Sequence, residues 1–306
     1  MSNCLVTGGA GFIGSHLVDE LIRLDHNVII IDNLSTGSKN NINPKAEFIL
    51  NDICSFNYLQ DIFRNRSFDI IFHLAAKPNV QESIDSPKIT HSINVEGTHN
   101  LLLLAKEYKV PKFIFSSSSA IYGEQPTLPL VETMKPNPLS PYALHKLLCE
   151  QYCKLYFELY GIKTVSLRYF NVFGPRQNTE SNYSCIIPKL VAASKSHNFF
   201  EIFGDGKQTR DFCYIDDVIK ANIIAAFSGN NVWGETINVG SGQSHSVNEI
   251  VHLVVKYLKS DSVIKHGPKV IESRDTLSDT TKMTKLLLKP NNNFKKNLYH
   301  TIDSFI

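Results

Sequence analysis

The hydrophobic residues in the first half of the chain fall into two alternating patterns. Short runs rich in β-branched and aromatic residues are typical of strands buried in a parallel sheet, and the longer stretches between them have helical spacing. We expect strands at Cys4–Thr7, Val28–Asp32, Phe48–Leu50, Ile70–His73 and Phe113–Ser116, and helices at Ile13–Leu24, Leu59–Arg64 and Ile89–Tyr108. This regular alternation predicts an α/β fold with a doubly wound parallel sheet, the Rossmann fold.

The second half begins regularly and then loses this rhythm. A long helix is expected over Pro141–Tyr160, where Gly161 ends it, followed by a strand at Thr164–Arg168. We expect a first domain over residues 1–170 and a smaller C-terminal α/β lobe over residues 171–306, with some segments returning to the first domain. Further along we expect loops at Gly174–Asn182, Gly204–Arg210 and Lys289–Lys296, and a closing helix at Leu298–Ile306.

Composition narrows the possible partners. The formal net charge of +2 over 306 residues gives no reason to expect nucleic acid or an anionic membrane. The first residues lack a signal-peptide pattern, and no apolar run approaches the roughly 20 residues that cross a bilayer. The six cysteines are scattered without a zinc spacing, so we expect a reducing cytoplasm and no metal.

A glycine-rich turn joins the first strand to the first helix. Gly8, Gly11 and Gly14 follow the strand at the G-x-x-G-x-x-G spacing. Gly8 permits the tight turn, Gly11 admits a pyrophosphate to the backbone, and Gly14 allows close helix–strand packing. The phosphates would then lie on the free N–H groups of the helix N-terminus, so a dinucleotide is the expected ligand.

An acidic residue selects between the two nicotinamide dinucleotides. Asp32 ends the second strand, 18 residues after Gly14, where its carboxylate can bind the adenosine ribose and repel a 2′-phosphate. No arginine lies nearby, so NAD is favoured over NADP. Asp52, after the third strand, either meets the adenine or simply caps a helix.

Two further features provide acid–base chemistry. Tyr142 and Lys146 lie at i and i+4, on one face of the predicted long helix. Lowering the pKa of a tyrosine by about 3 units needs roughly 4 kcal/mol, which one cation at about 4 Å supplies at an effective dielectric constant of about 20. The run Ser116–Ser119 follows a buried strand, at the edge where such sheets bind ligands, so one of its hydroxyls can contact the substrate oxygen.

Together these features resemble the extended short-chain dehydrogenases/reductases, and among them the UDP-glucose and UDP-N-acetylglucosamine 4-epimerases. The resemblance covers nearly the whole chain. Its blocks are Thr7–Gly14, Asp32–Gly37, His73–Ala76, Asn94–Thr98, Ser118–Gly123, Ser140–Lys146, Arg168–Arg176, Gly204–Phe212 and Asn238–Gly240.

The resemblance implies a role for individual residues. Ser118 matches the catalytic serine or threonine, Tyr142 the base, and Lys146 the residue that activates the base and holds the nicotinamide ribose. The implied NAD-binding residues are Gly8, Gly11, Phe12, Ile13, Gly14, Asp32, Asn33, Ser35, Thr36, Gly37, Asp52, Ile53, Leu74, Ala75, Ala76, Asn94, Ser116, Tyr142, Lys146 and Tyr169. The implied substrate-binding residues are Ser83, Ser117, Ser118, Ser119, Tyr142, Asn171, Gly204, Arg210, Lys269, Arg274 and Thr276.

The C-terminal region departs from the family pattern. Lys269 stands where these enzymes usually have a phosphate-binding arginine, so either Lys269 contributes a point charge or Arg274 replaces it. Arg210 either binds a phosphate or pairs with a neighbouring aspartate. Thr276 aligns beside carbon 2 of the sugar, where a small residue leaves room for an N-acetyl group or for glucose.

The reaction is inferred from the two residues after Ser118. Related 4,6-dehydratases have acidic residues at the positions of Ser119 and Ala120, and related decarboxylases have a glutamate at Ala120. Without a second acid or base, simple 4-epimerisation of a UDP-sugar through a 4-keto intermediate is the expected reaction. A dehydratase, a decarboxylase, an epimerase of a uronic acid or heptose, and a non-catalytic NAD-binding regulator remain alternatives. The resemblance also implies a homodimer through a four-helix bundle, formed by Ile89–Tyr108 and Pro141–Tyr160 of each subunit.

Overall fold

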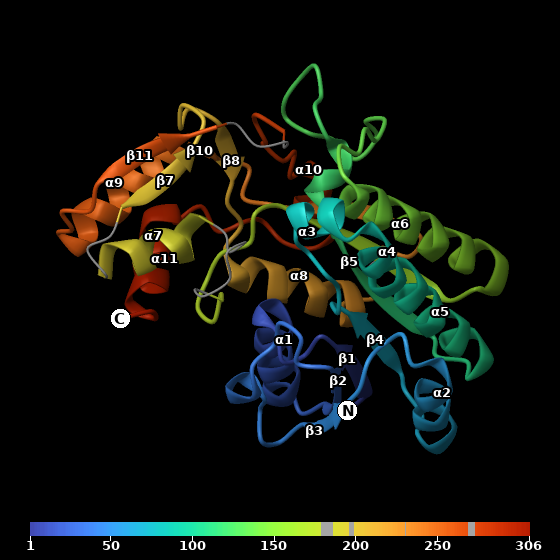
Figure 1. The fold of residues 1–306 in the computed structure, drawn as a ribbon. Coiled ribbons are helices and arrows are strands. Elements are labelled where there is room, and N and C mark those ends of the chain that lie inside the picture. Colours follow the sequence, from blue (N-terminus) through green and yellow to red (C-terminus); the bar gives the residue numbers. More distant parts are fainter. Residues whose placement is uncertain (179–185, 196–198, 230, 269–272) are drawn as a thin grey trace.

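The computed structural model describes residues 1–178, 186–195, 199–229, 231–268 and 273–306. Its centre is a seven-stranded parallel sheet with the strand order β3-β2-β1-β4-β5-β6-β9 (Figure 1). The strands are β1 (Asn3–Thr7), β2 (Asn27–Asp32), β3 (Glu47–Leu50), β4 (Ile70–His73), β5 (Lys112–Ser118), β6 (Lys163–Tyr169) and β9 (Thr236–Val239). The doubly wound sheet that the hydrophobic pattern predicts is therefore confirmed.

Helices cover both faces of this sheet. On one face lie α1 (Phe12–Arg23) and α8 (Ile215–Phe227), which pack against each other. On the other lie α2 (Phe56–Asn65), α5 (Gly97–Glu107) and α6 (Pro141–Tyr160). Each face has its own buried hydrophobic cluster, so the sheet is shielded from water on both sides.

The predicted helix Ile89–Tyr108 is interrupted. It begins as α4 (Pro87–His91), widens into a π-helical turn at Ser92–Glu96, and continues as α5; the short α3 (Val80–Asp85) precedes it. Within this wider turn, the carbonyl of Asn94 accepts hydrogen bonds from the Thr98 hydroxyl and the Cys149 thiol. Helical spacing could not reveal this local change.

The C-terminal lobe is built around short strands. β7 (Phe200–Phe203) pairs in parallel with β11 (Ile264–Gly267), and β8 (Thr209–Asp211) pairs antiparallel with β10 (Ser244–Ser246). Its helices are α7 (Ile186–Lys195), α9 (Val247–Leu258) and α11 (Phe294–Asp303), whereas α10 (Thr281–Leu286) packs against β9 of the main sheet. Between these segments α8 and β9 rejoin the first domain, because β9 pairs with β6 of the main sheet.

Two loop predictions were wrong at their ends. The loop Gly204–Arg210 gives way to β8 at Thr209. The loop Lys289–Lys296 ends at Phe294, where α11 begins, because this residue is buried beside Phe173 and stacks on His245 with ring centroids 3.9 Å apart. The lysines that follow Phe294 made this segment look like a polar loop, so the sequence did not indicate that Phe294 is buried. The part of Gly174–Asn182 beyond residue 178 lies outside the described residues.

Candidate active site

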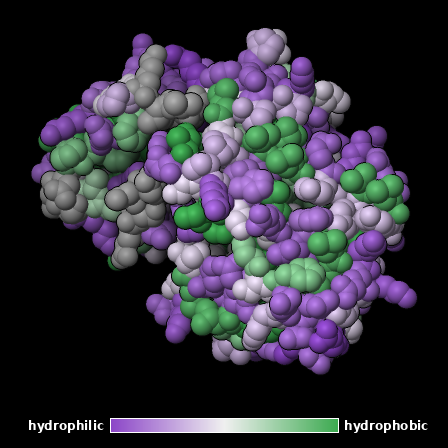
Figure 2. Space-filling model, turned by 45° about the vertical axis from the view of Figure 1, so that its right-hand side comes forward, coloured by the Kyte–Doolittle hydropathy of each residue, from purple (hydrophilic) through white to green (hydrophobic). Residues whose placement is uncertain are grey.

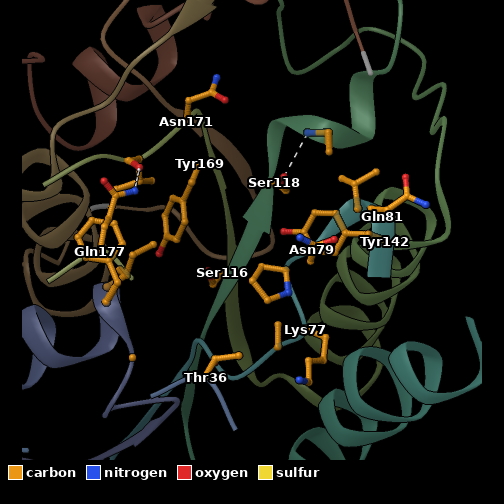
Figure 3. Close-up of a pocket in the computed structure, with 18 of the residues that line it drawn as sticks. Thr36, Lys77, Asn79, Gln81, Ser116, Ser118, Tyr142, Tyr169, Asn171 and Gln177 are labelled. Atoms are coloured by element: carbon orange, nitrogen blue, oxygen red, sulfur yellow. Dashed lines mark hydrogen bonds between the residues drawn. The ribbon is translucent and has the colours of Figure 1, made fainter. Parts of the chain in front are cut away.

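A cavity of about 1210 Å³ opens at the carboxyl ends of the parallel strands, between the main sheet and the C-terminal lobe. A pocket for one drug-sized ligand typically measures about 300–1,000 Å³, so this cavity is larger than one such ligand requires. Figure 3 shows β5 at its centre, with Tyr142 on one side and Tyr169, Asn171 and Gln177 on the other.

The glycine turn forms one end of this cavity. Gly8 adopts φ +73°, and a Cβ atom there would lie 2.7 Å from the Ala75 nitrogen. A Cβ atom on Gly14 would lie 2.1 Å from the Gly8 carbonyl oxygen, so only glycine lets α1 approach the turn this closely. Gly11 faces the cavity, which leaves the backbone accessible to a phosphate. Phe12 and Ile13 line the cavity beside it.

Asp32 is held in place at the end of β2. Its carboxylate accepts hydrogen bonds from the backbone N–H groups of Ala10 at 3.0 Å and Leu34 at 2.8 Å, and it lines the cavity. Asp52 both lines the cavity and caps the backbone, since it accepts from the Cys54 N–H at 2.8 Å. The helix-cap interpretation of Asp52 is wrong, because Ser55 is the N-cap of α2 and Asp52 caps the turn before it. Its contact with the adenine stays a prediction. Asn33, Ser35, Thr36 and Ile53 also line the cavity.

Two residues expected to contact NAD do not line the cavity. Gly37 packs against Ala10, where a Cβ atom would lie 3.0 Å away. The Asn94 side chain instead binds both backbone groups of Lys77, accepting from its N–H at 2.7 Å and donating to its carbonyl at 3.0 Å. Asn94 therefore fixes the loop after β4. That loop places Leu74, Ala75 and Ala76 on the cavity wall.

The tyrosine and lysine occupy the first two turns of α6. The helix begins at a Ser140 cap, whose hydroxyl accepts from the Ala143 N–H at 3.2 Å, and Pro141 takes the first helical position. Lys146 Nζ donates to the Ser116 carbonyl at 2.6 Å and lies 6.0 Å from the centre of the Tyr142 ring. Both side chains are buried and both line the cavity.

Ser83 of α3 is hydrogen-bonded to the first turn of this helix. Its hydroxyl accepts from the Tyr142 backbone N–H at 3.1 Å and donates to the Val80 carbonyl at 2.6 Å. The side chain is fully buried and does not line the cavity. The expected contact of Ser83 with substrate is therefore corrected, because its hydroxyl is used to position the start of α6.

The serines of the run have different partners. The Ser116 carbonyl receives Lys146, whereas the Ser117 hydroxyl donates to Glu150 at 2.6 Å. Ser118 accepts from the Ala120 N–H at 3.2 Å and lines the cavity, as does Ser119 (Figure 3). Successive residues of a strand point to opposite faces, which is why only one of the central hydroxyls is paired with Glu150. Ser117 also lines the cavity, although its hydroxyl is bonded to Glu150, and its expected contact with substrate stays a prediction.

Three expected substrate residues converge on the opposite wall. Asn171 donates to the Asp211 carbonyl at 3.1 Å and to the Thr276 hydroxyl at 3.4 Å. Arg210 donates to the carbonyls of Thr209 at 2.9 Å and Arg274 at 2.7 Å. Asn171, Arg210 and Thr276 all line the cavity, so residues distant in sequence form one surface.

A buried carboxylate holds this wall together. Asp211 is fully buried and accepts from the backbone N–H and hydroxyl groups of Ser241 and Ser278 and from the Gly242 N–H. These bonds join β8 to the segments around residues 241 and 278. Satisfying every lone pair of a buried carboxylate in this way makes the wall rigid.

Two expected substrate residues, Arg274 and Gly204, do not line the cavity. The Arg274 side chain is half exposed and pairs with Asp205 at 3.6 Å and Asp275 at 3.8 Å. Its replacement of the usual phosphate-binding arginine stays a prediction. Gly204 lies outside the cavity, and its N–H donates to Gly267. Lys269 lies outside the described residues. Tyr169 does line the cavity, with its hydroxyl bonded to Asn222.

Several polar residues of the cavity were not anticipated. Lys77, in the loop after β4, forms an ion pair with Glu82, with Nζ and Oε1 3.3 Å apart. No spacing rule distinguishes such loop residues from ordinary surface ones. The other polar lining residues that were not predicted are Asn51, Asn79, Gln81, Ser140, Gln177, Lys189, Glu201, Gln208 and Ser273.

Within the described residues, no three His, Cys, Asp or Glu side chains converge as metal ligands. In the same part of the chain, no helix is both long enough and apolar enough to cross a membrane.

The fold, the glycine turn and the buried tyrosine–lysine pair define a dinucleotide-dependent enzyme of the short-chain dehydrogenase/reductase type. Residues 4–240 match the model of the NAD-dependent epimerase/dehydratase family. The chain belongs to this family. It is an NAD-dependent epimerase, and its cofactor is NAD.

Relatives of the chain act on UDP-sugars. A putative UDP-glucose 4-epimerase of Methanocaldococcus jannaschii is 46% identical over 82% of this chain and 80% of its own. The UDP-glucose 4-epimerase of Thermotoga maritima, solved with UDP-glucose, has a TM-score of 0.95 at 37% identity, covering 99% of this chain and 98% of its own. The UDP-N-acetylglucosamine 4-epimerase of Methanobrevibacter ruminantium, solved with UDP-N-acetylmuramic acid, has a TM-score of 0.93 at 39% identity over the same shares.

Turnover is expected to fall as the pH rises above about 8. Burial lowers the pKa of Lys146 to about 8, so rising pH removes the charge that favours the Tyr142 phenolate. The measurement is kcat against pH from 6 to 10 in buffers of constant ionic strength. Lys146→Arg, which stays charged over this range, should lose the alkaline decline at whatever activity it retains. A wild-type kcat that is still constant at pH 10 would contradict the assignment.

Proposed function

We propose that this enzyme interconverts the 4-epimers of a UDP-sugar, with UDP-N-acetylglucosamine, UDP-glucose or both as substrate. One observation carries the proposal: Ser118, Tyr142 and Lys146 share a cavity with the glycine turn, and no acid or base stands at positions 119 and 120. We assign NAD mainly to residues 1–170 and the sugar nucleotide mainly to the lobe of residues 171–306.

The chemistry assigned to the chain is proton transfer and positioning. Tyr142 removes the proton of the 4-hydroxyl, and Lys146 stabilises the phenolate that does so. The Ser118 hydroxyl holds the same substrate oxygen. NAD, when bound, would supply a hydride acceptor for carbon 4, and the reaction as a whole involves no net oxidation.

Epimerisation also requires the sugar to present both faces. Arg210 is a buried cation of the substrate wall, where it would hold a diphosphate while the 4-keto sugar turns about its diphosphate bonds. The cavity volume of about 1210 Å³ supports such a rotation. A small hydroxyl and a methyl group at Ser119 and Ala120 favour this reaction over elimination or decarboxylation, which need a second acid or base there.

The first test is direct conversion. Purified protein incubated with UDP-N-acetylglucosamine or UDP-glucose should form the corresponding galacto epimer without added NAD. Proton NMR of the anomeric region measures the appearance of this product over time. Tyr142→Phe should lower kcat by about a hundredfold or more while retaining NAD, because it removes only the proton acceptor. A 4-keto-6-deoxy product, a pentose product, or no reaction with either sugar would refute the proposal.

Thr276 supports an open pocket beside carbon 2. It is small, nearly buried and bonded within the substrate wall. Thr276→Tyr should lower kcat/KM for UDP-N-acetylglucosamine at least about tenfold more than for UDP-glucose, because the larger side chain competes with the N-acetyl group. Thr276→Val, which keeps the size and loses the hydroxyl, should affect both sugars alike. If Thr276→Tyr lowered kcat/KM equally for both sugars, Thr276 would not determine which sugar the enzyme accepts.

We also propose that the enzyme is a homodimer through α5 and α6. One side of α6 exposes Leu144, Leu148, Leu155 and Leu159, each 37% exposed or more, at spacings of one and two turns. Figure 2 turns this side of the molecule forward and shows hydrophobic patches on it. Covering such a stripe with the same stripe of a second copy satisfies the two-fold symmetry of most dimers.

The double variant Leu148→Glu/Leu155→Glu should be monomeric, because two charges would be buried in the interface. Mass in solution at micromolar concentration, by light scattering after size exclusion, measures this. Leu50→Glu on β3 is the control, since Leu50 is 60% exposed at the far edge of the sheet and should leave the dimer intact. A wild-type monomer would refute the assignment.

A further inference from the structure

A buried ionic network lies beside the serine run. Arg168 of β6 forms a bidentate pair with Glu150 of α6, at 2.9 Å from Nε and 2.7 Å from Nη2. The Ser117 hydroxyl of β5 donates to the same carboxylate at 2.6 Å. Each of the three side chains is at most 4% exposed. The network therefore joins two strands and the helix of the catalytic tyrosine inside the core.

The network also reaches the segment that follows Ser118. The Arg168 guanidinium lies over the Tyr122 ring, 4.7 Å from its centre. The Tyr122 hydroxyl donates to Asn238 Oδ1 of β9 at 2.6 Å. Tyr122 is the last residue of the 3-10 turn Ser119–Tyr122. The ion pair therefore contacts Ser117, directly before Ser118, and Tyr122, four residues after it.

Glu150 lies one turn beyond Lys146 and two turns beyond Tyr142 on α6. Its carboxylate therefore connects the helix of the base to the strand of the serine. A buried ion pair is weak evidence for stability alone, since packed hydrophobic residues often serve as well. Its directional bonds are suited to fixing relative position, which an apolar cluster does less strictly.

We propose that Ser117, Glu150 and Arg168 are positioning residues that hold Ser118 of β5 in register with Tyr142 and Lys146 of α6. The inference rests on the proposed function, because that function makes Ser118 and Tyr142 act on one substrate oxygen. Reacting groups must be aligned within a fraction of an ångström for full rate, and a 1 Å displacement costs about a hundredfold.

Glu150 has a second effect on the same constellation. Burial lowers the pKa of Lys146, and the negative charge of Glu150 is among the groups that oppose this. His73 of β4 is buried with its pKa lowered to about 3, so it is neutral at working pH and does not repel the ammonium. The other groups facing Lys146 are the thiols of Cys149 and Cys153, the phenol of Tyr142, the ring of Phe115 and the carbonyl of Ser116.

The primary test compares Ser117→Ala with Ser166→Ala. Ser166 lies on the adjacent strand β6 and is as buried as Ser117, at 3% exposed. Its strand partner is Phe115, two residues before Ser117 in β5. Both variants lose one buried hydroxyl, but only the first disconnects β5 from Glu150. Ser117→Ala should lower kcat by about tenfold with unchanged KM and NAD content, whereas Ser166→Ala should keep kcat within about twofold. Equal kcat values for the two variants would overturn the proposal.

Hydrogen exchange tests the same point without substrate. Amides of residues 117–123 should exchange at least about tenfold faster in Ser117→Ala than in the wild type, and those of Ser166→Ala should not, because only the first variant releases this segment. Unchanged exchange in Ser117→Ala would overturn the positioning role. If wild-type protein converts no UDP-sugar but this local change occurs, the proposed function fails and the link between β5 and α6 stands.

Glu150→Gln provides a second signature. The amide keeps the shape and removes the charge, so the pKa of Lys146 should fall further and the alkaline decline of kcat should move to lower pH. A purely structural role would lower the melting temperature and leave the pH profile in place. If the unpaired Arg168 prevents this variant from folding, Ser117→Ala decides the question.

Discussion

The reversal of strand order at β1 is the constraint on which the rest of the molecule depends. The chain moves outward from β1 to β2 and β3 and then crosses back to start β4 on the other side of β1. Connections on either side of that point leave in opposite directions, so a crevice opens at the carboxyl edge of the sheet. The glycine turn, Asp32 and the β4 loop all follow strands that end at this crevice. Binding and chemistry are concentrated there because the connections that leave this point in opposite directions do not cover it.

Sequence patterns were most informative where local chemistry and local structure coincide. The three glycines, Asp32, Tyr142 and Lys146 all belong to motifs in which spacing alone imposes a geometry. The buried strands were recognisable for the same reason, since their side chains pack on both faces of the sheet. These features could be derived before any long-range contact was known.

The residues whose roles the sequence did not reveal depend on contacts made across the fold. Ser83 and Asn94 face backbone groups of distant segments, and Ser117 faces a carboxylate 33 residues away. A serine or an asparagine has the same appearance in a sequence whether it binds a ligand or the protein itself. Arg274 illustrates the converse: a charge that suits a phosphate is paired with two aspartates nearby.

The return of α8 and β9 to the main sheet has a consequence for how this enzyme can change. The C-terminal lobe is not a continuous stretch of sequence, because the chain leaves it and re-enters it around these elements. Exchange of the whole lobe between relatives by a single recombination event would divide the parallel sheet. Individual substitutions on the wall that Asp211 holds together can instead change the sugar pocket and leave the parallel sheet intact.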